Sequence, residues 1–146
     1  MRQSLLSTLV LALMVLACAH AVVAQPAPKQ SGAVPLTGAA EVPGPGDSHG
    51  SGTVIVTPNP DKGEVCYELT VTNLQEVVAA HIHEGAAGKE GPVKVDLTAP
   101  KSGTVKGCTR AEAAVIQGIM QQPANYYVNV HTAEFPKGAL RAQLAQ

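Results

Sequence analysis

The sequence is poor in aromatic and charged residues. It has no tryptophan, one phenylalanine and three tyrosines, and only 14% of its residues are charged. A core built from this chain must therefore consist mainly of valine, leucine, isoleucine and alanine. The formal net charge at pH 7 is -1, and no run of basic residues occurs. Nucleic acids and anionic membrane surfaces are therefore not expected partners.

Sequence motifs for common enzyme reactions are also missing. The chain has no Gly-rich phosphate loop, no Ser/His/Asp order typical of hydrolases and no paired carboxylates in a Gly-rich context. Neither phosphoryl transfer nor hydrolysis is therefore indicated. The sequence favours a non-enzymatic binding or interaction module, whose partner would be an extracytoplasmic protein or a small ligand.

No apolar run reaches the 20 or so residues that a membrane-spanning helix needs. The run at residues 5–19 follows Arg2 and precedes small residues at 22–24, which is the order of a secretory signal peptide. We predict that residues 1–24 are such a signal, and that the rest of the chain is exported to the periplasm or the medium. An uncleaved anchor helix would need a longer run, and lipidation at Cys18 would need Leu rather than Val three residues before it.

Export limits what the cysteines can do. Removal of the signal leaves Cys66 and Cys108, and an even pair in an exported chain is usually a disulfide. Closing a loop of about 42 residues would stabilise the fold by about 3 to 4.5 kcal/mol on the chain-entropy model. A metal-binding thiol pair and a reactive nucleophile are the alternatives, and an oxidising compartment disfavours the nucleophile.

Short apolar runs alternate with turn signals along most of the chain. They follow a Pro/Ser/Gly-rich lead-in at residues 25–33, which we expect to be disordered. The pattern predicts one all-β domain over residues 34–146, with strands at 51–57, 64–72, 77–83, 92–97, 126–131 and 139–144. A Gly-rich loop at 84–91 separates the third strand from the fourth. Apolar residues at helical spacing predict one short helix at 109–121, which Thr109 could cap and Pro123 stops.

Two histidines share one face of an expected strand. His81 and His83 are two residues apart, so both imidazoles leave the same face. His131 has the matching phase in a later strand and Arg141 in the last one, so the four side chains form one polar cluster if these strands are neighbours. Three neutral imidazoles suit copper or zinc. The alternative is a set of histidines that are hydrogen-bonded within the sheet or solvated, as is expected of His49 in its loop.

Several sequence blocks together resemble the CHRD domain, the module that is repeated in chordin and occurs singly in many exported bacterial proteins. They follow the order of that family over residues 36–144: TGAAEVP at 37–43, GSGT at 50–53, AHIHEGAAG at 80–88, GPV at 91–93, YYVNVHT at 126–132 and FPKGALRAQL at 135–144. The resemblance implies a β-sandwich outside the cytoplasm, with Cys66 and Cys108 as the cysteine pair common in bacterial members. Ala142 stands where the family more often has Gly, and His49 is not part of the pattern. The growth-factor binding of chordin depends on modules that this chain lacks, so it is not transferred.

A second resemblance is to the copper/zinc superoxide dismutases. The segments HIHE at 81–84, VH at 130–131 and GALR at 138–141 follow the order of their HxHE block, later Val-His and C-terminal arginine segment. In those enzymes the histidines bind copper and the arginine attracts superoxide. The resemblance thus implies copper at His81, His83 and His131, with Arg141 serving any superoxide chemistry. Residues 84–130 contain no histidine, so the zinc-binding loop has no counterpart. The expected fold is an antiparallel β-sandwich, immunoglobulin-like or superoxide-dismutase-like, and copper binding is the alternative to a partner-binding module.

Overall fold

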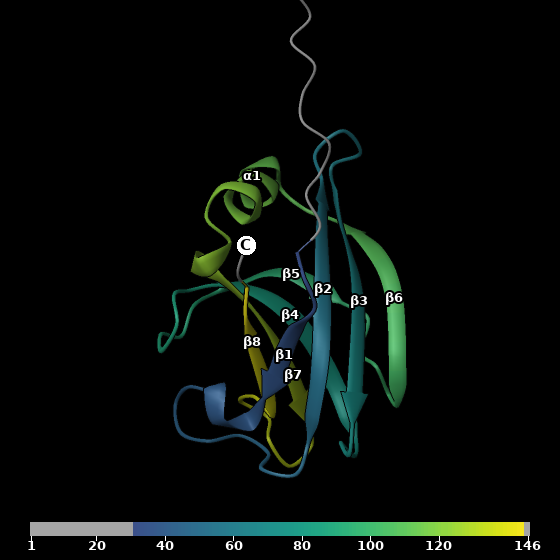
Figure 1. Cartoon of the computed structure of the whole chain (residues 1–146), viewed down its shortest axis with the longest axis vertical. Helices are drawn as coiled ribbons and strands as arrows, with labels where there is room; N and C mark the ends of the chain where they lie inside the picture. Colours follow the sequence, from purple (N-terminus) through teal and green to yellow (C-terminus); the bar gives the residue numbers. More distant parts are fainter. Residues whose placement is uncertain (1–30, 145–146) are drawn as a thin grey trace, which may run out of the picture.

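The computed structural model describes residues 31–144, so the expected signal peptide and residues 25–30 of the lead-in lie outside it. The described part contains eight strands, one α-helix and two short 3-10 helices (Figure 1). The strands are β1 (Val34–Thr37), β2 (Ser51–Asn59), β3 (Glu64–Thr72), β4 (Val77–Glu84), β5 (Val93–Leu97), β6 (Gly103–Arg110), β7 (Tyr126–Thr132) and β8 (Leu140–Gln143). The helices are η1 (Gly38–Ala40), α1 (Ala113–Gln121) and η2 (Pro123–Asn125). None of the described helices is long and apolar enough to cross a membrane.

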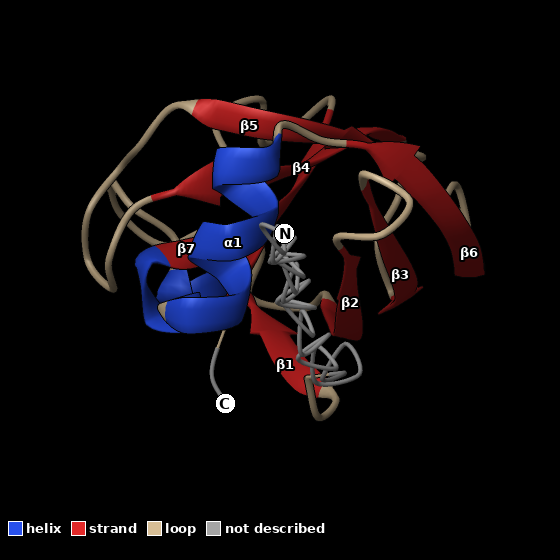
Figure 2. Cartoon of the chain, turned by 90° about the horizontal axis from the view of Figure 1, so that it is seen from above, coloured by secondary structure: helices blue, strands red, loops and turns tan. Residues whose placement is uncertain are grey.

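All eight strands belong to one antiparallel sheet. Their order is β5-β4-β7-β8-β1-β2-β3-β6. The sheet curls until its two edge strands, β5 and β6, come into contact, and α1 lies across one end of the resulting open barrel (Figure 2). The predicted all-β antiparallel fold with one short helix is confirmed, and one curled sheet supplies both layers of the expected sandwich.

The core lies inside the curled sheet and follows from strand alternation. In β3 the residues Val65, Tyr67, Leu69 and Val71 are buried, whereas the side chains between them are more exposed. The buried face of α1, formed by Val115, Ile116 and Ile119, joins the same core and closes one end of the barrel. Full burial of one such aliphatic side chain contributes about 1.5 to 3 kcal/mol. The barrel interior is therefore apolar, and chemistry must be carried by the outward faces of the strands.

Two strands were not predicted, and one of them shortens the helix. β1 and β6 were missed, and α1 begins at Ala113 rather than at residue 109. Thr109 does not cap α1, because it lies in β6 opposite Val65, and Glu112 precedes the helix without a capping side-chain hydrogen bond. Pairing with β3 therefore overrides the local helical pattern. Ser31, in the lead-in expected to be disordered, exchanges two hydrogen bonds with Val56 of β2.

The expected disulfide joins β3 to β6. Cys66 and Cys108 lie directly opposite each other in the ladder between these strands and are bonded. Their sulfur atoms lie near the Glu64 carboxylate, within the spacing that a metal site would need. A disulfide sulfur is not a thiolate, however, and thiolates are the form that binds metals. The alternative of a metal-binding thiol pair is therefore wrong for the bonded chain.

Candidate metal centre

The predicted histidine cluster forms because β4 and β7 are neighbours. His83 lies opposite Tyr127 in their ladder, His81 opposite Asn129, and His131 opposite Ala79. The alternate residues of β4, Ala80 and Ile82, point into the core and are buried. All three histidine side chains are thus directed to the outer face of the barrel, as the strand phase predicted.

The three imidazoles converge on one point. One ring nitrogen from each of His81, His83 and His131 lies within 4.8 Å of the others. The closest pair is His81 Nδ1 and His131 Nε2, at 3.1 Å. Two nitrogens that share a metal at about 2.0 to 2.1 Å cannot be more than about 4.2 Å apart. The pair of His81 and His131 satisfies that limit, and no pair of the set is more than 4.8 Å apart.

Two backbone carbonyls decide which nitrogens face the cluster. His83 Nδ1 lies 2.9 Å from the carbonyl oxygen of Gly91, and His131 Nδ1 lies 3.0 Å from that of Pro136. A carbonyl oxygen only accepts, so both Nδ1 atoms carry their protons and both neutral rings present an unprotonated Nε2. His81 Nδ1 must then donate to His131 Nε2. Hydrogen bonding of the second ring nitrogen to a carbonyl is the usual arrangement of metal-binding histidines.

His83 leaves one buried nitrogen without a partner. Its Nε2 makes no hydrogen bond to any group in the described structure. Most buried polar atoms are satisfied, so an unpaired one calls for an explanation such as an ion or a catalytic role. A metal ion at the point shared with His81 and His131 would satisfy it.

Burial keeps two of the rings in the form that binds metals. Desolvation lowers the pKa of His83 and of His131 below the usual 6.5, against the raising effect of their carbonyl partners. The positive charge of a neighbouring protonated imidazole lowers both pKa values further. These rings are therefore neutral at physiological pH, as coordination requires.

His81 has an exposed carboxylate as a neighbour. Its Nε2 lies 3.7 Å from Oδ1 of Asp96 on β5, and the Asp96 side chain is exposed. His81 would reach a metal through Nδ1, because that is the atom nearest to His131. Its Nε2 would then carry the proton and face the carboxylate, which is a common second partner of a metal-binding histidine.

Arg141 does not stand in solvent. The residue is 2% exposed. Its guanidinium donates to the carbonyls of Lys89 and Ala86 and to the Gln143 side chain, at 2.9, 3.0 and 2.9 Å. Attraction of an anion from solvent requires an accessible charge with free donors. Arg141 instead ties β8 to the loop between β4 and β5.

A buried carboxylate, missed in the sequence, lies on the same outer face. Glu41 is 7% exposed, and its two oxygens accept from the Asn129 side chain at 2.7 and 2.9 Å. Desolvation raises the pKa of Glu41 to about 7, although the Arg141 charge and the hydrogen bonds from Val42 and Asn129 act in the opposite direction. The only sequence signal for Glu41 is its place in the first CHRD-like block.

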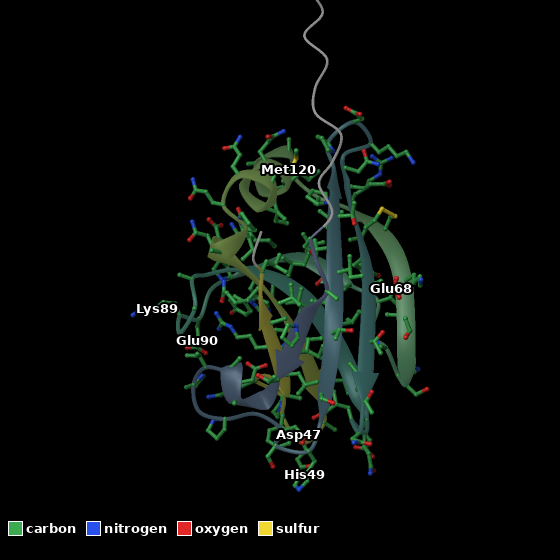
Figure 3. All side chains as sticks on the ribbon, in the orientation of Figure 1. Asp47, His49, Glu68, Lys89, Glu90 and Met120 are labelled. Carbon is green, nitrogen blue, oxygen red and sulfur yellow. A yellow bond between two sulfur atoms is a disulfide. The ribbon has the colours of Figure 1, made fainter. Side chains whose placement is uncertain are left out.

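His49 lies apart from the cluster, as its loop position suggested. Its side chain is 92% exposed beside Asp47. Figure 3 shows both residues at the end of the molecule away from α1, whereas Lys89 and Glu90 mark the loop that Arg141 holds. His49 is therefore a solvated histidine and a natural control for the other three.

Comparison with known protein families gives one result. The family model described as the CHRD domain matches residues 33–144, which is almost the whole described part. No curated protein and no solved structure matches the chain.

Proposed function

The chain belongs to the CHRD-domain family, a family of binding and interaction modules, and we propose that it is an exported copper-binding protein. His81, His83 and His131 would hold the ion on the outer face of β4 and β7. Export rests on the N-terminal pattern of the sequence. The cross-strand disulfide supports an oxidising compartment, the periplasm or the extracellular medium.

The unpaired Nε2 of His83 carries the proposal. It is buried and unprotonated, and one nitrogen of its ring lies within 4.8 Å of nitrogens of His81 and His131. A buried nitrogen that stays unsatisfied costs about 1 to 3 kcal/mol. A metal ion bound to Nε2 would satisfy this nitrogen and remove that cost.

The donor set favours copper over other metals. Imidazole nitrogens suit copper, zinc, nickel and iron, and Cu²⁺ has the highest affinity for a given nitrogen site among the divalent ions of this series. The cluster itself contains no thiolate and no carboxylate, and the Asp96 carboxylate lies beside Nε2 of His81, not beside the Nδ1 that contacts His131. The three rings leave further coordination positions open, which water or another small ligand would fill.

Titration of the purified, tag-free and metal-free protein with copper tests the proposal. We expect one ion per chain, measured by calorimetry against a competing chelator, with zinc bound more weakly. Replacement of His83 or His131 by alanine should weaken binding by more than tenfold, because each change removes a ligand. His49→Ala is the matched control and should bind as the unmodified chain does. Equal binding by the unmodified chain and by the His83→Ala and His131→Ala variants would show that the cluster is structural.

A further inference from the structure

Three side chains from three strands form a stack beside the proposed metal site. The His83 ring lies parallel to the Tyr127 ring, with 4.7 Å between centroids and 8° between planes. The Arg141 guanidinium carbon lies 3.5 Å from the centroid of the same tyrosine ring. Since β4 and β8 flank β7 on opposite sides, Tyr127 is held between the histidine and the arginine. A guanidinium in this position is attracted to the face of the tyrosine ring.

Gly91 links the tyrosine to the histidine a second time. Its N–H donates to the Tyr127 hydroxyl at 3.2 Å, and its carbonyl accepts from His83 Nδ1 at 2.9 Å. A Cβ at position 91 would overlap the carbonyl oxygen of Glu84. The close approach of the two backbone segments therefore requires glycine, and it fixes the direction of the carbonyl that holds the His83 ring.

Arg141 anchors the loop that carries Gly91. Its guanidinium donates to the carbonyls of Ala86 and Lys89, which lie in the loop between β4 and β5. Gln143, two residues along β8, donates to the carbonyl of Gly85 at 2.9 Å. Side chains of β8 thus hold the backbone of this loop from its beginning to Lys89. The loop is nevertheless exposed around Lys89 and Glu90 (Figure 3).

We propose that Tyr127 and Arg141 are positioning residues for the metal ligand His83. This inference rests on the proposed copper binding. Tyr127 sets the plane of the His83 ring and the place of the Gly91 carbonyl, and Arg141 holds Tyr127 and the loop. Together they make His83 present Nε2, rather than Nδ1, to the metal. The partners that orient a metal-binding histidine typically change affinity by about 10- to 100-fold when they are replaced.

Two conservative variants test this role. Tyr127→Phe keeps the stacked ring and removes the hydroxyl that accepts from Gly91. Arg141→Lys keeps a positive charge, but an ammonium cannot stack on the ring or donate in the same planar fork. We expect about 10-fold weaker copper binding in each variant, with a changed Cu²⁺ electron paramagnetic resonance spectrum. In the metal-free protein, ¹⁵N NMR should show the His83 proton on Nδ1 in the unmodified chain and partly on Nε2 in Tyr127→Phe.

Tyr67→Phe is the matched control. Tyr67 is another buried tyrosine whose hydroxyl accepts a backbone hydrogen bond, from Thr98 at 2.8 Å, but it lies in the core. It should lose stability and keep the copper affinity, the spectrum and the His83 proton position unchanged. If Tyr127→Phe and folded Arg141→Lys also lose only stability, the inference is overturned while copper binding stands. If Arg141→Lys does not fold, Tyr127→Phe decides. If the unmodified chain does not bind copper, the proposed function itself fails.

Discussion

Replacement of the buried Glu41 by glutamine should remove a pH dependence from the stability of the domain. The pKa of this carboxyl is raised from 4.5 to about 7, chiefly by burial. The folded state therefore holds the proton more tightly than the unfolded state does. The resulting stability is fully present below pH 4.5 and is lost as the pH rises through 7. Each unit of pKa difference is worth about 1.4 kcal/mol, so the loss amounts to about 3 kcal/mol by pH 8.

Urea unfolding of the metal-free, disulfide-bonded protein measures this effect. The free energy of unfolding should be determined for the unmodified chain and for Glu41→Gln at several values between about pH 4.5 and 8. Histidine titration affects both proteins alike, so the difference between the two free energies isolates Glu41. As the pH rises, the unmodified chain should lose about 3 kcal/mol of unfolding free energy relative to Glu41→Gln. A difference that stays constant would refute the reasoning, as would an equal change in the control Glu90→Gln, which alters an exposed glutamate of the loop.

Two further predictions concern the covalent and the apolar support of the fold. Paired replacement of Cys66 and Cys108 by alanine should lower the free energy of unfolding by about 2 to 4.5 kcal/mol, because the unfolded chain gains conformational entropy without the cross-link. Denaturant titration under oxidising conditions checks this, and an unchanged midpoint would contradict it. Ile82→Ala should cost about 2 to 5 kcal/mol, because Ile82 is fully buried in β4. The exposed Val78→Ala on the same strand is its control, and equal losses in the two variants would show that the strand is not packed as described.

The strands that could be predicted from the sequence are those with clear alternation. β3 and β4 show it, because each buries one face in the core and exposes the other. β6 was missed because it lacks that contrast: its only large apolar side chain is Val105, and most of the strand is exposed. What makes it a strand is its full pairing with β3. Such pairing is a tertiary effect, and the local sequence does not encode it.

The position of the histidines could be predicted, but their orientation could not. Strand phase placed His81, His83 and His131 on one face. The hydrogen bonds that choose their tautomers come from the carbonyls of Gly91 and Pro136 in two loops. Side-chain alternation contains no information on where a loop carbonyl lies. The burial of Arg141 could not be predicted for a related reason, since the loop that covers its guanidinium could not be placed from spacing alone.

The fold and the candidate site are coupled through the register of β4. Burial of Ile82 in the core obliges His81 and His83 to face outward, because neighbours along a strand point to opposite sides. A slip of one residue would bury the two histidines and expose Ile82, so the hydrophobic effect that stabilises the barrel also selects the histidine face. Register leaves the imidazoles free to rotate, and for His83 the stack on Tyr127 and the carbonyl of Gly91 remove that freedom. The core therefore determines which face carries the histidines, and the loop held by Arg141 supplies the carbonyl that binds His83 Nδ1.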